Sequence, residues 1–196
     1  MTDAGDETGG SGDSDAPREA VVLDYLPTGV PDEQRTTTPV AYALGLEDFR
    51  CYLVRFEADT DMDVGDRVDI DPRGEAVSRV QRIDHDDLPG AAQSELEYGV
   101  GDIVDSEERR FVDFFNDAQA ITTRLHALNL LPGIGKKLRN NVLDQRKRQP
   151  FESFDDLTDR VSGLHDPRGA LIDRIVEEIR EEEMKYRIFT ARDPGE

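Results

Sequence analysis

Cysteine, tryptophan and positive charge are scarce in this sequence of 196 residues. It contains one cysteine, Cys51, and no tryptophan. A single cysteine excludes an internal disulfide and a zinc site built from several thiolates. Because Cys51 lies in the apolar run Cys-Tyr-Leu-Val, we expect a buried small side chain rather than a reactive thiol.

Long apolar runs are absent as well. The apolar runs extend over only a few residues, whereas a membrane-spanning helix needs about 20. The N-terminus has no basic stretch followed by an apolar one, so we expect no signal peptide. These absences predict a soluble, cytoplasmic protein that does not bind membranes.

Negative charge dominates what is present. Acidic residues outnumber basic residues by 44 to 24, which gives a formal net charge of −20. Such a surface discourages contact with polyanions and membranes. It is also typical of proteins that work in molar salt, where the screening length falls to about 3 Å. We therefore expect a halophilic protein.

The first 84 residues divide into a tail and a strand-rich domain. Residues 1–18 are mainly Gly, Ser, Thr and Asp, which predicts a disordered acidic tail. Residues 19–84 contain short strand-like segments separated by turn residues, at 20–26, 39–44, 49–56, 66–70 and 78–83. Five short strands favour a small closed antiparallel β-barrel. We interpret it as an oligonucleotide/oligosaccharide-binding (OB)-like barrel, with an SH3-like barrel as the alternative.

Helical periodicity begins after residue 84. It predicts connecting helices over 85–118, an all-helical domain over 119–190 and a C-terminal tail over 191–196. Gly99 and Gly101 are expected to weaken the middle of the first helix. A core stripe at helical spacing is formed by Phe111, Phe114 and Phe115. The fold class is therefore α+β, with a barrel followed by a helical domain.

Capping signals place the remaining elements. Ser153 is positioned as the N-cap of one helix, and Asp166, followed by Pro167, as the N-cap of the last. The predicted elements are helices over 121–130, 136–149 and 151–161, a last helix from Pro167 onward, and a short strand over 186–189.

The segment LPGIGKK, residues 131–137, has the composition of a phosphate-binding turn between two helices. Leu131 and Ile134 are expected to enter the core. Gly133 and Gly135 allow positive φ and remove side chains that would block a phosphate. A helix N-terminus with unpaired N–H groups is an anion site that the helix dipole reinforces. The groups expected to be unpaired are the N–H groups of Gly133, Ile134, Gly135 and Lys136.

Leu-Pro-Gly-Ile-Gly followed by a basic residue resembles the helix-hairpin-helix motif. The resemblance implies that this turn binds the backbone of a nucleic acid without reading its bases. Residues 151–161 resemble a degenerate second copy that packs against the first. Its partial counterpart of the hairpin is Ser162-Gly163-Leu164. The alternative is a corner between two helices whose glycines serve only the turn.

The chain from about residue 20 to 189 resembles a larger family. The segments VLDYLPTG, PVAYALG, FFNDAQAITTRLHALNLLPGIGKKL, PFESFDDLTDRV and GLHDPRGALIDRIVEEI are similar to the archaeal family called domain of unknown function 655. That resemblance implies a barrel joined to a helix-hairpin-helix domain that binds nucleic acid. Genes of the family tend to lie beside those for an RNA polymerase subunit, a ribosomal protein and an rRNA adenine dimethyltransferase. This neighbourhood implies RNA as the ligand and ribosomal or RNA polymerase components as partners.

Basic residues gather around the glycine turn. Residues 124–148 contain seven basic residues and one acidic residue, a net charge of +6, while the rest of the chain sums to −26. This local excess favours a nucleic-acid contact, and the alternative is a solvated helix face. The basic residues are Arg124, Lys136, Lys137, Arg139, Arg146, Lys147 and Arg148.

High salt shifts the emphasis from these side chains to the backbone. Four phosphate contacts imply a log–log slope of roughly −3, so a change from tenth-molar to molar salt costs about a thousandfold in affinity. Fixed backbone N–H groups depend less on displaced counterions than lysines do. A second surface on the barrel would stack single-stranded bases on Tyr25, Tyr42, Phe49 and Tyr52, although such residues more often belong to the core.

We find no arrangement of residues that is typical of an enzyme. Asp84-His85-Asp86-Asp87 is one contiguous loop, which cannot supply carboxylates from separate elements to a metal ion, so we interpret it as a solvated linker. His126 lies on the predicted helix before the hairpin, where we expect helix packing or a phosphate contact. His165 precedes the N-cap Asp166, and we expect it to help that cap. The sequence lacks a P-loop, a nucleophile elbow and a dinucleotide fingerprint. We therefore predict no catalytic residue, no metal and no cofactor.

Taken together, these patterns predict a non-enzymatic protein that grips a nucleic-acid backbone through residues 131–137. RNA is favoured over DNA only through the family resemblance. Two alternatives stay open. One is a DNA-binding accessory protein, and the other is an adaptor of the transcription or ribosome machinery that meets basic proteins through its acidic surface.

Overall fold

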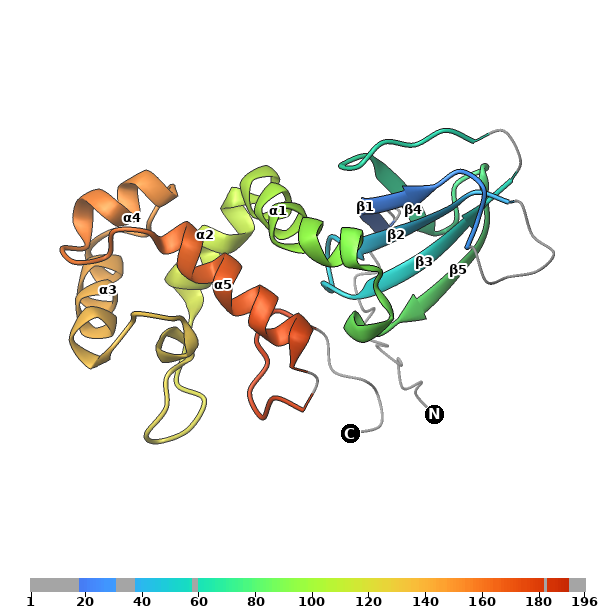
Figure 1. Cartoon of the computed structure of the whole chain (residues 1–196). Helices are drawn as coiled ribbons and strands as arrows, with labels where there is room; N and C mark the ends of the chain where they lie inside the picture. The colour runs from blue at the N-terminus through green and yellow to red at the C-terminus, as the bar shows by residue number, and fades with distance from the viewer. Residues whose placement is uncertain (1–17, 31–37, 58–59, 182, 191–196) are drawn as a thin grey trace, which may run out of the picture.

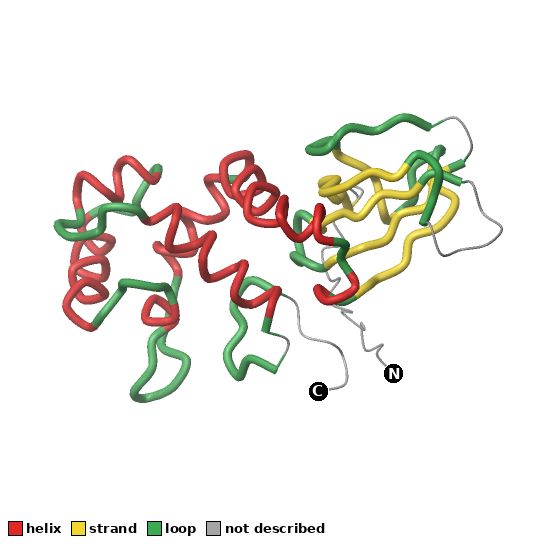
Figure 2. Tube along the Cα trace, viewed as in Figure 1, coloured by secondary structure: helices red, strands yellow, loops and turns green. Residues whose placement is uncertain are grey.

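The computed structural model describes residues 18–30, 38–57, 60–181 and 183–190. An antiparallel sheet forms one end of the molecule and the helices form the other (Figures 1 and 2). The predicted α+β class is confirmed. The predicted tails, 1–18 and 191–196, lie outside the described residues except for Arg18, which begins the first strand.

All five predicted strands are present to within two residues, and they pair in the order β4-β1-β2-β3-β5. The strands are β1 (Arg18–Leu26), β2 (Val40–Gly45), β3 (Cys51–Phe56), β4 (Arg67–Asp71) and β5 (Val77–Ile83). The prediction of a closed barrel is wrong. Strand β4 forms a hydrogen-bonded ladder with β1, and the described residues contain no such ladder between β4 and β5. The turn between β4 and β5 contains Pro72, which has no N–H to donate. The sheet is therefore a curled half-barrel.

Alternation along the strands divides the sheet into two buried faces. On β3, Cys51 and Leu53 belong to the core that faces the helices. Tyr52 and Val54 belong to a second core inside the curl of the sheet. Both faces are buried, which explains why β2 and most of β3 are apolar.

Helix α1 (Gly90–Ser106) covers the face of the sheet formed by β1 and β2. It is continuous through Gly99 and Gly101. A Cβ atom at Gly99 would come 2.6 Å from Leu23 Cδ2. Glycine at this position therefore lets the helix approach the sheet closely.

The other helices are α2 (Glu108–Asp117), α3 (Lys136–Arg148), α4 (Phe154–Arg160) and α5 (Pro167–Arg180). The predicted caps are confirmed, because Ser153 Oγ accepts from Asp156 N at 3.0 Å and Asp166 Oδ1 from Gly169 N at 2.7 Å. The predicted stripe is confirmed too: Phe111 and Phe115 are buried, and Phe114 packs against the same core. That core continues from the sheet through the helices without interruption.

The predicted helix over 121–130 is wrong. A bridge between Ala120 and His126 closes a loop, and only Ala127–Leu130 forms a short 3-10 helix. The sequence starts with Ile-Thr-Thr, and β-branched residues lose side-chain freedom in a helix. Thr122 Oγ1 also accepts from Leu125 N at 3.0 Å, which favours a turn.

The prediction of a strand over 186–189 is also wrong, because backbone N–H groups of this segment donate hydrogen bonds to the buried carboxylate of Glu178. Glu178 is fully buried and accepts hydrogen bonds from the N–H groups of Ile188, Phe189 and Thr190. Arg174 pairs with the same carboxylate at 2.9 Å. The segment therefore folds back on α5 instead of joining the sheet.

None of the helices in the described ranges combines the length and apolarity that crossing a bilayer requires.

Candidate nucleic-acid interface

The segment at 131–135 forms a tight turn that leads directly into α3. Leu131 and Ile134 are buried, as predicted, and Ile134 N donates to Leu131 O at 3.2 Å. Gly133 lies in the left-handed region with φ of 77°, where a side chain is strained. The turn thus holds its apolar side in the core and exposes its glycines.

Gly135 differs from the prediction, because its φ of −78° suits any residue. A Cβ atom there would meet no atom within 4 Å. Neither backbone strain nor packing within the protein therefore requires glycine at this position. What the missing side chain provides is open space in front of the first turn of α3.

The N–H groups at this turn are partly used, which corrects the predicted set. Those of Ile134 and Gly135 donate to Leu131 O and Gly133 O. Among the described residues, no backbone acceptor faces the N–H groups of Gly133, Lys136 and Lys137. The donors available to a ligand are therefore centred on the first turn of α3.

The N-terminus of α3 differs from those of the other described α-helices because α3 begins with two basic residues. Gly135, its N-cap, has no side chain to cap it, and the first turn contains no acidic residue. Its first two residues are instead Lys136 and Lys137, both exposed. Positive charge is unfavourable at a helix N-terminus. An external anion would relieve both the lysines and the open N–H groups.

Arg139 and Asn129 brace the turn through a chain of two hydrogen bonds. Asn129 Nδ2 donates to Ile134 O at 2.9 Å, and Arg139 Nη1 donates to Asn129 Oδ1 at 3.0 Å. The half-buried Arg139 therefore positions the turn through Asn129. Asn129 was not singled out from the sequence, where an asparagine before a turn is too common to be a signal.

The remaining basic residues do not form one patch with the turn. Arg146 Nη1 donates to Phe115 O and Ala118 O at the end of α2, and burial lowers the pKa of its guanidinium. Lys147 and Arg148 are exposed at the far end of α3, about 15 Å along the axis from Lys137. Arg124 is exposed in the loop before the 3-10 helix. The basic residues predicted to form one cluster are therefore separated by the length of α3.

A shallow groove runs beside the turn. Its volume is about 600 Å³, and it is lined by the turn and by Arg174 and Glu177 of α5. Arg174 Nη1 pairs with Glu177 Oε2 at 3.0 Å, so this carboxylate is partly neutralised. Leu130 and the exposed Pro132 also line the groove.

His126 supports the turn from the core side. Its Nδ1 accepts a hydrogen bond from Leu128 N at 3.2 Å and thereby caps the 3-10 helix before the turn. Burial, and then the charges of Arg146 and Arg139, hold the pKa of His126 below its ordinary value of 6.5. The cap needs an unprotonated Nδ1, so this histidine serves the fold of the turn.

The aromatic residues considered for base stacking lie in the core. Tyr42, Phe49 and Tyr52 are each less than a tenth exposed. Tyr52 Oη donates to Asp48 Oδ2 at 2.7 Å, and burial with this hydrogen bond raises its pKa to about 12. Tyr25 is half-buried and donates its hydroxyl to Thr60 O. Stacking on the barrel is therefore not available to Tyr42, Phe49 or Tyr52.

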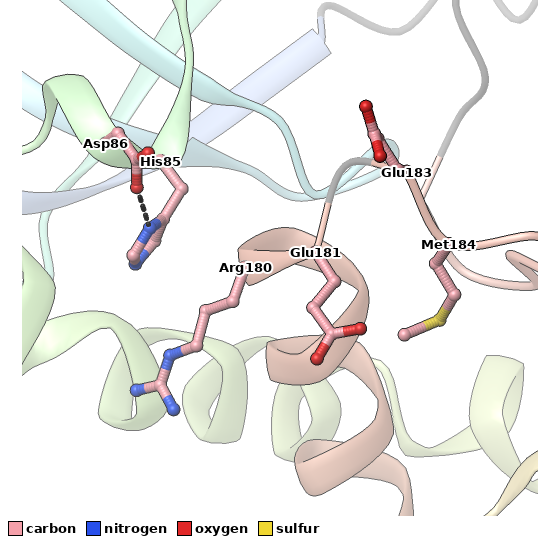
Figure 3. Close-up of a pocket in the computed structure, with 6 residues that line it drawn as sticks. All are labelled: His85, Asp86, Arg180, Glu181, Glu183 and Met184. Carbon is pink, nitrogen blue, oxygen red and sulfur yellow. Dashed lines mark hydrogen bonds and ion pairs between the residues drawn. The ribbon is translucent and has the colours of Figure 1, made fainter.

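The acidic linker lies at the edge of another pocket. Asp84 N donates to Asp87 Oδ2 at 3.2 Å, so these acids organise their own turn. In the pocket of about 410 Å³, His85 turns toward Asp86, while Arg180 and Glu181 point apart (Figure 3). Within the described ranges, no group of three or more His, Cys, Asp or Glu residues is placed to hold a metal ion.

Comparison with known proteins places the chain among archaeal relatives without an assigned role. The model of a family described as "Protein of unknown function (DUF655)" matches residues 16–191. The "Uncharacterized protein MJ0038" of Methanocaldococcus jannaschii is 37% identical over 179 residues, covering 90% of this chain and 81% of that protein. The crystal structure of Af1531 from Archaeoglobus fulgidus, 39% identical, covers 89% of this chain and 99% of that chain with a TM-score of 0.80. The chain therefore belongs to the DUF655 family, as the resemblance of its segments predicted.

Proposed function

We propose that this protein is a non-enzymatic nucleic-acid-binding protein that grips a phosphate backbone at the N-terminus of α3, in ribosome biogenesis or translation. One observation carries the proposal. The helix begins with an uncapped glycine and two exposed lysines, an arrangement that costs the free protein stability and suits a bound anion. RNA is chosen over DNA because of the gene neighbourhood that the family resemblance implies.

A helix-hairpin-helix interpretation of this domain is supported by a second turn of the same shape. Gly163 has φ of 95°, and Leu164 N donates to Val161 O at 3.0 Å. These features match Gly133 and the bond from Ile134 to Leu131 in the first turn. Asn141 of α3 donates to Ser162 O at 3.1 Å, which joins the second turn to the helix that follows the first.

The strand order supports an OB-like sheet rather than an SH3-like one. Strands β1, β2 and β3 pair consecutively, and β4 returns to lie beside β1. This order, 4-1-2-3, is that of a Greek key, and OB folds are partly open Greek-key barrels of five strands. The halophilic part of the proposal rests on the excess of 44 acidic over 24 basic residues.

The proposal is tested by giving α3 the cap that α5 already has. In Gly135→Asp, a carboxylate would occupy the first-turn N–H groups and repel phosphate. Folding is expected to change by only a few tenths of a kcal/mol, because aspartate and glycine are both accepted at N-caps. Affinity for single-stranded RNA and for duplex DNA, measured by fluorescence anisotropy in salt from tenth-molar to molar potassium chloride, is expected to fall at least about tenfold.

Asp166→Gly is the matched control, because it removes the cap from α5 and leaves α3 unchanged. It should lower stability slightly and leave affinity intact. Equal affinity of Gly135→Asp and the wild type would sink the proposal. The ratio of RNA to DNA affinity in the wild type decides which nucleic acid the turn prefers.

An adaptor role is favoured by one feature of the surface. Tyr98 on α1 is 72% exposed, the most exposed of the large hydrophobic residues described. Glu97 and Asp102 are exposed on the same helix, and an exposed aromatic residue near carboxylates suits an arginine-bearing partner protein. Loss of a co-purifying basic protein on Tyr98→Ser, with nucleic-acid affinity absent in the wild type, would support this second candidate.

A further inference from the structure

Among the described residues, Glu177 is the only acidic one that lines the groove beside the turn at 131–135. Gly133 and Gly135 line the same groove, so the carboxylate shares one concave surface with the proposed phosphate contact. A carboxylate repels a phosphate at short range. Its presence in this groove is therefore unfavourable for a bound nucleic acid, unless the carboxylate accepts a hydrogen bond from the same ligand.

A buried arginine holds Glu177 in place. Arg174 Nη1 donates to Glu177 Oε2 at 3.0 Å. The same guanidinium donates from Nε to the buried carboxylate of Glu178 at 2.9 Å and from Nη2 to Tyr186 O. Because Arg174 is only 6% exposed and bonds to three groups of the protein, it orients Glu177 and does not serve as a phosphate ligand itself.

The second carboxylate oxygen of Glu177, Oε1, is unused. In the described part of the chain no donor bonds to it, and the side chain is 47% exposed. Leu130 and the exposed Pro132 supply apolar surface, and the N–H group of Gly133 has no backbone acceptor in the described ranges. The groove therefore combines an acceptor, a donor and an apolar surface in about 600 Å³, an ordinary volume for a small-ligand site.

The chemistry of a nucleic-acid backbone limits what can donate to this acceptor. Phosphate oxygens and the ring oxygen of the sugar only accept hydrogen bonds. The 2′-hydroxyl of ribose is a donor as well as an acceptor, and DNA lacks it. A site that binds the backbone without reading bases therefore meets a single kind of donor, and RNA alone carries it.

We propose that Glu177 accepts a hydrogen bond from a ribose 2′-hydroxyl, and that the groove lined by the turn and α5 thereby selects RNA over DNA. The inference rests on the proposed function, because the phosphate contact brings the adjoining sugar into the groove. With DNA the carboxylate gains no donor and keeps its unfavourable interaction with the phosphates. The same residue thus favours one nucleic acid and disfavours the other.

The test compares oligouridylate with oligodeoxyuridylate, each of about 12 nucleotides, on the full chain by fluorescence anisotropy. Both have the same bases, so the ratio of their affinities reports on the sugar. The wild type is expected to bind the RNA about tenfold more tightly, because hydrogen bonds to charged groups are among the stronger ones. In Glu177→Ala the ratio should fall to about one, since RNA loses a hydrogen bond and DNA loses a repulsion.

Asp173→Ala is the matched control. Asp173 is exposed on the same helix and does not line the groove, so this variant removes a negative charge and leaves the acceptor in place. It should strengthen the binding of both oligomers alike and leave their ratio unchanged. A wild-type ratio in Glu177→Ala overturns the proposal, and so does an equal fall in both variants.

A third oligomer separates the hydroxyl donor from the shape of the sugar. Oligouridylate with 2′-fluoro groups keeps a ribose-like sugar conformation but has no hydrogen to donate. It is expected to bind the wild type as weakly as the DNA does. If it binds as tightly as the RNA, the preference comes from sugar shape and the hydrogen bond to Glu177 is rejected.

Gly135→Asp distinguishes this inference from the proposed function. If it binds like the wild type while Glu177→Ala loses the preference, the sugar contact stands and the N-terminus of α3 is not the phosphate site. If it weakens both oligomers while Glu177→Ala behaves like its control, the phosphate contact stands and the sugar contact falls. A wild type without a preference for RNA overturns the inference alone, and one that binds neither oligomer overturns both.

Discussion

Two turns in this protein have nearly the same backbone and opposite chemistry. The first turn (131–135) and the second turn (161–165) each place a glycine at positive φ and close with the same N–H to carbonyl bond. The first leads into α3, whose one buried residue is Val142. The second leads into α5, which buries Pro167, Leu171, Ile172, Arg174, Ile175, Val176, Glu178 and Ile179. One turn therefore presents a surface helix and the other anchors a core helix.

The N-termini of α3 and α5 also differ in how they are capped. At α5 the carboxylate of Asp166 accepts from Gly169 N and occupies the place that an external anion would take. At α3 no side chain of the described residues caps the helix, and its first two residues are Lys136 and Lys137. Backbone geometry alone therefore does not make an anion site. The residue at the N-cap and the charges of the first turn decide which of the two turns can bind one.

The largest expected effect tests α5 as a helix anchored in the core. Glu178→Gln should lower the free energy of unfolding by about 3–5 kcal/mol, because Arg174 would stay buried without its charged partner. Glu177→Gln is the control, since Glu177 pairs with the same arginine from a half-exposed position and should cost about 1 kcal/mol or less. Urea denaturation measures both. Equal losses would contradict a buried anchor at Glu178.

The next effect separates folding from binding at the two glycines. Gly133→Ala and Gly163→Ala should each cost about 1–2 kcal/mol, because both positions need the left-handed conformation. Only Gly133→Ala should also weaken RNA binding, measured by anisotropy at a temperature where both variants are folded. If Gly163→Ala weakens binding as much, the two turns share the ligand and the contrast between them is lost.

A smaller effect is expected from removing the two asparagine side chains that donate hydrogen bonds to the turns. Asn129→Ala removes the donor to Ile134 O, and Asn141→Ala removes the donor to Ser162 O. Each should cost about 1 kcal/mol in thermal denaturation. Weaker RNA binding is expected for Asn129→Ala alone, because Asn129 also holds Arg139 under the first turn. Unchanged affinity in both variants would mean that the brace does not position the ligand.

The smallest effect is a dependence of stability on pH that arises at the first turn. The pKa of His126 is lowered in the folded protein, so below its ordinary value of 6.5 the unfolded chain binds a proton that the folded chain does not. Stability should therefore fall as pH drops from about 6.5 toward the lower folded value, and it should be level above that range. His126→Gln should flatten the profile in thermal denaturation, whereas His165→Gln, at the exposed second turn, should not. An unaltered profile in His126→Gln would contradict the assignment.

Local signals predicted much of this fold. The five strands, the caps at Ser153 and Asp166 and the phenylalanine stripe were predicted because each depends on residues a few positions apart. The helix over 121–130 failed for a related reason. Its apolar residues have helical spacing, but the β-branched run Ile-Thr-Thr and the bonds to Thr122 Oγ1 favour a turn.

The candidate site was predicted only in part, because its electrostatics depend on distant partners. Seven basic residues were counted as one cluster, yet Arg146 is committed to carbonyl groups of α2 about 30 residues earlier in the chain. The basic residues at the end of α3 are separated from the turn by the length of the helix. A charge count along the sequence contains no information on which guanidinium groups are already occupied.

The sequence by itself determined the turn, because Leu131 and Ile134 enter the core and Gly133 permits the left-handed backbone between them. It also determined that two lysines follow, at a helix start without a capping side chain. Tertiary structure decided which groups remain available there. Long-range packing assigned Arg139 and Asn129 to bracing the turn, Arg146 to the end of α2, and Tyr42 and Tyr52 to the core. Bonds within a few residues follow from local sequence, whereas the pairing of a charge depends on every element that folds against it.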